Sequence, residues 1–389
     1  MRILHTVEFY SPSVGGMQEV VRQVSERLVS LGHDVTVATT GLRRRTQKII
    51  NGVKIAEYNI SGNLVWGMKG DTNAYQQFLL NCQFDVITSF AAQQWATDLV
   101  LPILDRIPCK KVFVPTGFSG LYQPAYKEYF TQMPKWMGQY DVNVFLSDDY
   151  RDVNFAREHG IKNRVLIPNG AGADEFVTTA WVNIREKFQI PENHFLILHV
   201  GSHSGLKGHA EAISIFRKAK IRNAAFLLVA KNGGRCSLSC KMKNAWLKYS
   251  SRFYSLGKRL IVTELSRADT IAAYQQADLF IFPSHIECSP LVLFECMASR
   301  TPFLTTDVGN AAEIIRWSGG GRLLPTRRTP QGWSHADTVR SVWLLEEMYA
   351  DKQTRTAMGE AGFAAWKDRY TWEGIAKQYE RLYQNLMVS

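Results

Sequence analysis

Apolar positions in the first half of the chain alternate between short unbroken runs and stretches with helical spacing. Arg2–Val7 is a β-rich run, and the loop S-P-S-V-G-G follows it. Apolar residues then recur at spacings of three and four, which predicts a helix ending near Gly32: Val20, Val21, Val24, Leu28 and Leu31. The strands expected after this helix are Val35–Thr39, Asp85–Thr88, Lys111–Pro115, Asp141–Leu146 and Arg164–Ile167. This alternation predicts a parallel sheet covered by helices.

The pattern begins again after the turn signal Pro168-Asn169-Gly170. Phe195–Val200 is nearly all apolar, as expected for a buried parallel strand, and a helix is expected from about His209 to Lys220. Further strands are expected at Ala225–Ala230, Leu260–Thr263, Asp278–Phe282 and Pro302–Thr305. We therefore predict an α/β protein of two doubly wound domains, residues 1–175 and 176–370, with a C-terminal helix over residues 371–389.

The last stretch, Thr354–Met387, is helical by composition. Its buried stripe is expected to contain Trp366, Tyr370, Trp372, Ile375, Tyr379, Leu382 and Tyr383. Simple packing of this stripe on the second domain is one interpretation.

Length and composition agree with two globular domains. The chain has 389 residues, of which 46% are hydrophobic and 21% charged, which is ordinary for a folded protein. No apolar run approaches the roughly 18 residues that cross a bilayer, and the N-terminus has no signal-peptide pattern. We expect a cytoplasmic protein.

The net charge of +11 is unevenly distributed, because the stretch Ala212–Thr263 contains no Asp or Glu. Such a block attracts phosphates, acidic lipid headgroups or nucleic acid, or it is a solvated basic face. The aromatics Trp246, Tyr249, Phe253 and Tyr254 fit a single-strand-binding face or the buried side of one helix equally well. No recognised nucleic-acid module accompanies them, and we expect no nucleic-acid partner.

The six cysteines are scattered, so a disulfide framework is not expected: Cys82, Cys109, Cys236, Cys240, Cys288 and Cys296. Cys236 and Cys240 stand four positions apart. A structural zinc site needs about four ligands, and no second pair follows nearby in the sequence. We therefore expect no metal.

Two glutamates mark the most informative segment, Pro283–Ala298. A buried strand ends at Pro283, Glu287 lies on the following loop, and Glu295 lies inside a helix that starts near Pro290. The start of such a helix offers free N–H groups to a diphosphate or a sugar hydroxyl. In a doubly wound sheet, ligands bind beyond the carboxyl ends of the strands, and carboxylates accept hydrogen bonds from sugar and ribose hydroxyls.

At this point the chain resembles the retaining GT-B glycosyltransferases of family 4. Glu287 to Glu295 is similar to the family's E-x7-E motif, and Pro168-Asn169-Gly170 with Asp174 and Phe176 is similar to its interdomain segment. Three further segments resemble family motifs: the pair Gly15-Gly16, Val200-Gly201 through Lys207-Gly208, and Asp278–Ser284. All five motifs follow one another along the chain in the order that the family has. The resemblance implies a GT-B fold, with two Rossmann-like domains facing a central cleft and the C-terminal helix packing back toward the N-terminal domain.

The resemblance also implies roles. Glu287 and Lys207 would be catalytic, with Glu287 on donor-sugar hydroxyls and Lys207 neutralising the departing diphosphate, while Glu295 would hold the ribose. The remaining donor-binding positions would be Gly15, Gly16, Ser202, Leu265, Cys288, Ser289, Pro290, Leu291 and Val292. Thr116 and Gly117 would lie on the acceptor side. Front-face attack, assisted by the donor's own phosphate oxygen, requires no protein nucleophile, and without an Asp-x-Asp motif no metal or other cofactor is expected.

The chain departs from the family at two positions. Ser202 stands where the family usually has Arg, and Thr116 stands where many members have a catalytic-site His. His203 is either a substitute near the phosphates or an ordinary loop residue. A degenerate partner subunit and a GT-B nucleotide-sugar epimerase remain as alternatives. A dinucleotide-binding oxidoreductase is disfavoured by the glycine spacing and by Lys231 after the next strand.

The expected partners follow from the family. They are a nucleotide sugar, UDP- or GDP-linked, and a glycan or lipid-linked acceptor of hexosyl transfer in surface polysaccharide synthesis. Peripheral contact with an anionic membrane is a further hypothesis, through Arg43-Arg44-Arg45, Lys110-Lys111 and the aromatic segment Tyr122–Trp136.

Overall fold

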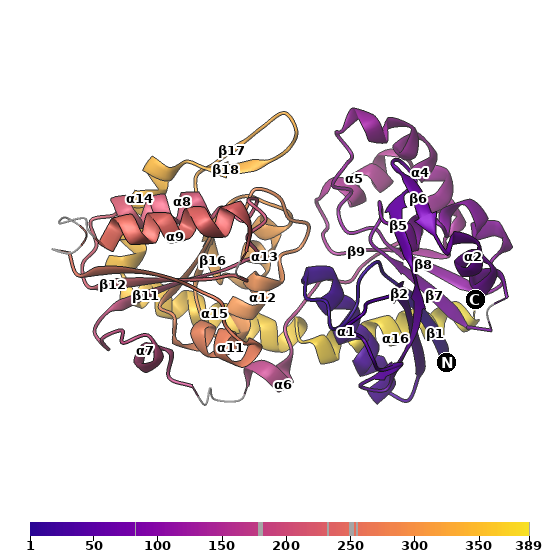
Figure 1. The fold of residues 1–389 in the computed structure, drawn as a ribbon, viewed down its shortest axis with the longest axis horizontal. Helices are drawn as coiled ribbons and strands as arrows, with labels where there is room; N and C mark the ends of the chain where they lie inside the picture. Colours follow the sequence, from indigo (N-terminus) through magenta and orange to yellow (C-terminus); the bar gives the residue numbers. More distant parts are fainter. Residues whose placement is uncertain (82, 178–181, 232, 249–252, 254–255, 389) are drawn as a thin grey trace. The chain divides into compact units, whose positions relative to one another are not determined.

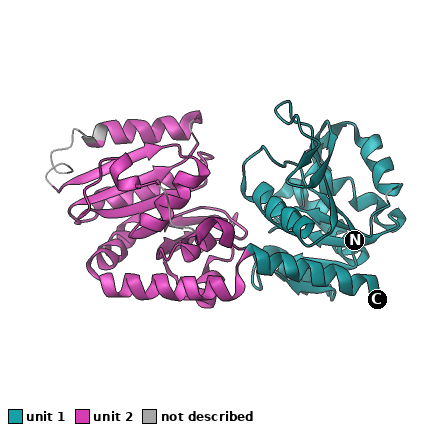
Figure 2. Cartoon of the chain, turned by 90° about the horizontal axis from the view of Figure 1, so that it is seen from below, with its two compact units in different colours: residues 1–169, 372–389 teal, residues 170–371 magenta. Residues whose placement is uncertain are grey.

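The computed structural model describes residues 1–81, 83–177, 182–231, 233–248, 253 and 256–388, and it divides the chain into two compact units (Figure 2). Unit 1 consists of Met1–Asn169 and Trp372–Ser389, and unit 2 of Gly170–Thr371. Residues 170–175, which the sequence analysis assigned to the first domain, lie in unit 2. There the Ala171 amide donates to the Tyr370 carbonyl oxygen at 3.0 Å, and Trp366 Nε1 donates to the Ala171 carbonyl oxygen at 3.0 Å.

Unit 1 is built on a sheet with the strand order β10-β9-β8-β7-β1-β2-β4-β3 (Figure 1). The sheet is parallel except for the β3–β4 pair. Its strands are β1 (Arg2–Thr6), β2 (Asp34–Thr40), β3 (Ile49–Ile50), β4 (Val53–Tyr58), β7 (Val86–Phe90), β8 (Lys110–Val114), β9 (Val142–Phe145) and β10 (Arg164–Leu166). The order reverses between β1 and β7, which makes the carboxyl ends of these two strands the switch point of the sheet.

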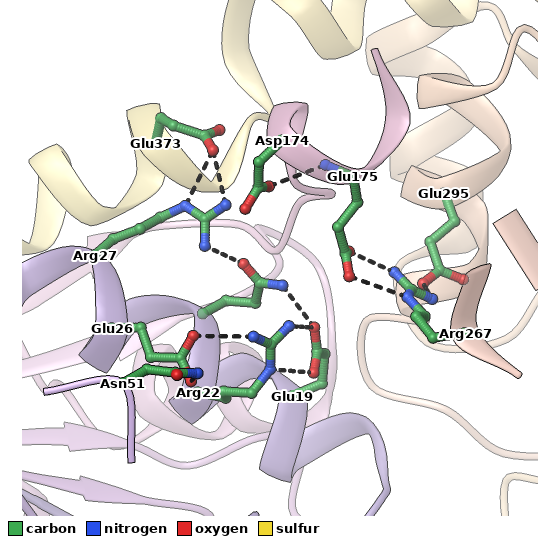
Figure 3. Close-up of polar contacts among 11 residues, drawn as sticks. Glu19, Arg22, Glu26, Arg27, Asn51, Asp174, Glu175, Arg267, Glu295 and Glu373 are labelled. Atoms are coloured by element: carbon green, nitrogen blue, oxygen red, sulfur yellow. Dashed lines mark hydrogen bonds and ion pairs between the residues drawn. The ribbon is translucent and has the colours of Figure 1, made fainter. Parts of the chain in front are cut away.

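The helices of unit 1 include the last helix of the chain. They are α1 (Gly16–Ser30), α2 (Thr72–Leu80), α3 (Trp95–Asp98), η1 (Leu101–Arg106), η2 (Pro124–Tyr126), α4 (Lys127–Gln139), α5 (Arg151–Glu158) and α16 (Trp372–Val388). Arg27 of α1 pairs with Glu373 of α16 at 2.7 Å (Figure 3). The buried Tyr383 hydroxyl lies 3.2 Å from His5 Nε2 and 2.7 Å from Thr88 Oγ1. The C-terminal helix therefore packs on the N-terminal unit, as the resemblance implied, and not on the second domain.

A glycine-rich hairpin, β5 (Ile60–Asn63) and β6 (Gly67–Gly70), also belongs to unit 1. Gly62 and Gly70 adopt φ of +95° and +103°. A Cβ at Gly62 would lie 2.0 Å from the Gly67 carbonyl oxygen, and one at Gly70 would lie 1.8 Å from the Asn59 carbonyl oxygen just before β5. Only glycine fits at these two positions. The sequence pattern did not predict this hairpin, because its residues lack an apolar alternation.

Unit 2 is built on a fully parallel sheet with the order β13-β12-β11-β14-β15-β16. Its strands are β11 (Phe195–Val200), β12 (Ala224–Val229), β13 (Lys258–Thr263), β14 (Leu279–Phe282), β15 (Phe303–Thr305) and β16 (Gly321–Leu323). A separate hairpin joins β17 (Thr326–Arg328) and β18 (Ser334–Ala336). The order reverses between β11 and β14, so the loops that follow these strands are the expected ligand-binding place in this unit.

Helices cover both faces of the unit 2 sheet. They are α6 (Ala173–Phe176), α7 (Ile184–Lys187), α8 (His209–Lys218), α9 (Gly234–Lys248), α11 (Arg267–Gln276), α12 (Leu291–Ala298), α13 (Ala311–Ser318), α14 (Thr338–Ala350) and α15 (Lys352–Arg369). Alternate residues of β11 belong to two separate apolar clusters. Leu196 and Leu198 lie in one cluster, and Phe195 and Ile197 lie in the other. Side chains on a strand point to opposite faces in turn, so the sheet has a core on each side. This explains the unbroken apolar runs in the sequence.

Candidate active site

The loops after β11 and β14 meet at the switch point of unit 2 and bring Lys207 to Glu287. Lys207 Nζ donates to Glu287 Oε1 at 2.5 Å, and Ser284 Oγ donates to the same carboxylate oxygen at 2.7 Å. The Glu287 side chain is 13% exposed and the Lys207 side chain 25% exposed. The structure thus joins the two residues that the resemblance named as catalytic, in a pair that is largely shielded from water.

A glycine makes the close approach of these two loops possible. Gly208 has φ of +68°, and a Cβ there would lie 1.8 Å from the Pro283 carbonyl oxygen. The backbones are joined directly as well, because the His285 amide donates to the Leu206 carbonyl oxygen at 2.8 Å. Any side chain at position 208 would push the two loops apart, and Lys207 would then move away from Glu287.

The residues just before α12 are held by hydrogen bonds from the loop that follows β15. Pro290 caps the helix, whose first residues are Leu291 and Val292. The Asn310 amide donates to the Cys288 carbonyl oxygen at 2.8 Å, and Asn310 Nδ2 donates to Ser289 Oγ at 3.2 Å. These bonds fix the residues before the helix, so that the N–H groups of its first turn keep one direction.

Glu295 carries a partner that the sequence analysis did not name. Arg267, the first residue of α11, donates from Nη1 to Glu295 Oε1 at 2.5 Å, and its Nη2 reaches Glu175 Oε2 at 2.7 Å (Figure 3). The Glu295 side chain is 10% exposed. Burial alone would lower the pKa of Arg267, but the carboxylates of Glu295 and Glu175 raise it above its ordinary value, so the guanidinium stays charged.

The other donor-binding residues expected in unit 2 lie at the ends of neighbouring strands. Leu265 follows β13, is half-buried and packs against the core on one face of the sheet. Ser202 follows β11 and is exposed. His203 is half-buried, and its ring centroid lies 4.7 Å from that of His209.

The four candidate residues of unit 1 also follow strands. Gly15 caps α1 in the loop after β1, and a Cβ on Gly16 would meet no described atom within 4 Å. Thr116 and Gly117 follow β8 with φ of +60° and +99°, and Phe118 continues at +47°. A β-branched residue rarely adopts such a φ, and backbone strain of this kind is found at functional sites. The Gly117 amide donates to Asp152 Oδ2 at 2.8 Å, which holds the turn in place.

Several basic residues in the charged segments are structural. Lys258 is buried and donates from Nζ to the carbonyl oxygens of Phe216, at 2.8 Å, and Ala219. The aromatic Phe253 is buried in the same core, whereas Tyr249, Tyr254 and the side chain of Trp246 lie outside the described residues. The solvated basic face that the sequence suggested is therefore interrupted at Lys258.

Some residues of the segments expected to contact a membrane are buried in the protein and are not available to a membrane surface. Arg45 is buried, pairs with Glu57 at 2.7 Å and donates to the Ser11 carbonyl oxygen at 2.7 Å. In the aromatic segment, Tyr129 and Phe130 belong to the core of unit 1. Arg43 and Arg44 remain exposed. In the part of the chain that the structure describes, every helix is too short or too polar to cross a bilayer.

Comparison with known proteins matches each half of the chain to a glycosyltransferase family model. Residues 182–363 match the model of the Glycosyl transferases group 1 family, and residues 14–175 match the model of Glycosyltransferase Family 4. An uncharacterised glycosyltransferase of Methanocaldococcus jannaschii is 26% identical over 100% of this chain and 99% of its own length.

Solved structures agree on the fold. The sucrose-phosphate synthase of Thermosynechococcus elongatus superposes with a TM-score of 0.78 at 16% identity, over 100% of this chain and 99% of its own. The Anabaena protein HepE, solved in complex with UDP and glucose, gives a TM-score of 0.70 at 13% identity, over 99% of this chain and 100% of its own.

Proposed function

Because the chain belongs to the GT-B glycosyltransferases of family 4, we propose that it moves a sugar from a nucleotide-diphosphate sugar to a glycan or lipid-linked acceptor with retention of configuration. The observation that carries this proposal is the Lys207–Glu287 pair beside the start of α12. A fixed cation and first-turn amides are the groups that stabilise the negative charge on a departing diphosphate.

The pair also supports separate roles for Lys207 and Glu287 when the donor binds. In the free enzyme, Glu287 shares Oε1 between Lys207 and Ser284. A pyrophosphate carries more negative charge than one carboxylate, so it competes for the Lys207 ammonium. The released Glu287 carboxylate then accepts hydrogen bonds from hydroxyls of the donor sugar. One contact in the free state is thereby exchanged for two in the complex, and neither ion is left unpaired.

Glu295 is proposed to hold the ribose. Its contact with Arg267 uses Oε1, and we propose Oε2 as the oxygen that accepts from a ribose hydroxyl. The guanidinium orients the buried Glu295 carboxylate, so the acceptor oxygen is fixed before the nucleotide arrives. Pre-organisation of this kind lowers the entropy cost of binding.

For the donor we propose a UDP- or GDP-linked hexose. The complex of HepE with UDP and glucose supports the UDP series, because that protein shares the fold along the whole chain. Transfer is proposed to need no metal and no protein nucleophile, since the donor's own phosphate oxygen can take the acceptor proton.

The acceptor is proposed to be a surface glycan or its lipid-linked precursor. Among the curated relatives are a lipopolysaccharide 1,2-N-acetylglucosaminetransferase of Salmonella typhimurium and an O-antigen glycosyltransferase of Escherichia coli, which support this class. Thr116 and Gly117 would line the acceptor side. If a lipid carries the glycan, the exposed Arg43 and Arg44 would contact the membrane surface. Retention of the protein by anionic vesicles at low salt in a flotation assay tests this contact.

The test of the proposal is a donor screen. Wild type is melted with UDP-, GDP-, ADP- and TDP-sugars in the presence of EDTA, and slow donor hydrolysis is followed in parallel. A ligand at 100 times its Kd should stabilise the fold by about 2.7 kcal/mol. We expect one nucleotide series to raise the melting point, Glu295→Ala to abolish the rise, and Glu360→Ala, a change at an exposed glutamate of α15, to keep it.

The alternatives give different results in the same screen. A degenerate partner subunit, the hypothesis raised by Thr116 and Ser202, would bind donors weakly or not at all and hydrolyse none. An epimerase would convert the donor sugar without any acceptor. Either result would replace the transferase proposal.

A further inference from the structure

Four potential metal ligands converge beside the loop that carries Lys207. They are His203, His209, Cys236 and Cys240, and one ligand atom of each lies within 4.8 Å of the others. His203 lies in the loop after β11, and His209 is the first residue of α8. Cys236 and Cys240 lie one turn apart on one face of α9. We propose that these residues form a structural Cys2His2 zinc site.

The chemistry and spacing of the ligands fit zinc. Zn²⁺ prefers four nitrogen and sulfur ligands in a tetrahedron, and its structural sites commonly use C-x2–4-C and H-x3–5-H pairs. Here the pairs are C-x3-C and H-x5-H, in the opposite order along the chain. Two thiolates and two neutral imidazoles also balance the charge of the ion, so a buried site would carry no net charge.

The distances require only a small contraction. Bond lengths of about 2.0–2.3 Å to zinc place tetrahedral ligand atoms about 3.3–3.8 Å apart. His209 Nδ1 already lies 3.2 Å from Cys236 Sγ, and the His203 and His209 ring centroids are 4.7 Å apart. Both cysteines are free thiols, so no disulfide competes with the metal.

Unpartnered nitrogen atoms are the independent sign of a missing ligand. Both ring nitrogens of His203 and the Nε2 atom of His209 are buried without a hydrogen-bond partner in the described part of the chain. A buried polar atom without a partner costs about 1–3 kcal/mol, and folded proteins rarely leave three together. A metal ion in the space between the rings would bind one nitrogen of each imidazole and so would give these buried rings a partner.

The sequence alone indicated no metal at this place. The two histidines precede the cysteines by more than twenty residues and reach them only because β11 and β12 are neighbours in the sheet. The loops and helices after both strands therefore meet. The proposed site would tie α9 to the loop that holds Lys207 and Gly208, so the metal would brace this loop without touching the donor. It does not depend on the proposed transfer reaction.

Metal content and cobalt spectroscopy test the site. Protein purified under reducing conditions without added metal is analysed by elemental mass spectrometry, and the apo form is then titrated with Co²⁺. We expect about one zinc per chain in wild type and, with cobalt, thiolate-to-metal charge transfer with the intense visible bands of a tetrahedral site. Cys236→Ser, which changes a half-exposed ligand, should weaken cobalt binding about 100-fold or more and remove the charge-transfer band.

Two control variants sharpen the outcome. Cys109→Ser removes a buried thiol of unit 1 and should bind cobalt like wild type. His335→Ala alters a second group of potential ligands, Glu211, His285 and His335, and should also leave the spectrum unchanged. A cobalt spectrum without the thiolate band, an unchanged spectrum in Cys236→Ser, or loss of the metal only in His335→Ala would overturn the proposal. Melting of each variant shows that it is folded when it is titrated.

Discussion

Replacing Arg267 by Met removes the cation between two carboxylates and keeps most of the side-chain volume. In the structure its Nη1 lies 2.5 Å from Glu295 Oε1, and the carboxylate side chain is only 10% exposed, while Arg267 itself is 42% exposed. Breaking a buried ion pair costs about 3–5 kcal/mol, and an exposed pair is worth about 0–1 kcal/mol. A buried carboxylate with a half-exposed partner lies between these limits, so we expect a loss of about 2 kcal/mol.

Calorimetry measures this loss as a shift in Tm. For a folding unit of about 200 residues, 1 kcal/mol corresponds to about 2–4 °C, so Arg267→Met should lower the transition of unit 2 by about 4–8 °C at pH 7. The matched control is Arg322→Met. Arg322 is 41% exposed and lies 2.6 Å from Glu347, but that glutamate is 59% exposed. An exposed pair is worth at most about 1 kcal/mol, so we expect a shift of less than about 4 °C for the control.

The comparison of the two variants identifies the cause. Equal shifts for Arg267→Met and Arg322→Met at pH 7 would refute the argument that the stranded Glu295 carboxylate carries the cost.

Lys207→Met should lower kcat about 100-fold or more, because a positioned charge on the leaving diphosphate is worth about 2.7–4 kcal/mol; Lys207→Arg should restore part of it, and steady-state kinetics on the donor found by the screen would measure both. Tyr383→Phe should cost about 1–3 kcal/mol in urea unfolding, since His5 Nε2 and Thr88 Oγ1 lose their buried partner; an unchanged midpoint would show that this hydroxyl does not anchor α16. Burial raises the pKa of Asp98 to about 6, above its unfolded value of about 4. The folded state thus binds this proton more tightly, and the associated stability is present below about pH 4 and lost as pH rises through 6, by up to about 3 kcal/mol. Asp98→Asn should remove this slope, which the difference in unfolding free energy between wild type and variant at pH 5 and pH 8 would reveal.

The strands of unit 2 could be predicted from the sequence because the sheet is buried on both faces. The boundaries expected for Phe195–Val200 are those of β11, and the other expected strands of this unit are all present within a residue or two. The hairpin β5–β6 could not be predicted in the same way. Its conformation depends on close backbone contacts at Gly62 and Gly70, which leave no periodic apolar signal.

The candidate site was only partly predictable. The spacing of Glu287 and Glu295, with a strand end before them and a helix start between them, identified the two acids and, through the resemblance, Lys207. Other supporting residues of the site come from distant segments. Arg267, the partner of Glu295, begins a different helix, and Asn310, which contacts Ser289, follows a different strand. Nothing local in the sequence distinguishes these residues, although Arg267 shortly follows the carboxyl end of β13, a position where ligand-binding residues gather.

The placement of α16 has a consequence for the order in which the protein is made. The residues that complete unit 1, Trp372–Ser389, are synthesised only after all of Gly170–Thr371 has been translated. Until then the face of α1 that contacts Glu373 is uncovered, and the His5 and Thr88 side chains lack the Tyr383 hydroxyl as a hydrogen-bond partner. All six strands of the main unit 2 sheet lie before residue 324, and unit 2 is one continuous segment, so it can fold before unit 1 is complete. A frameshift or nonsense mutation after codon 371 would therefore damage unit 1, although most of that unit is encoded before unit 2.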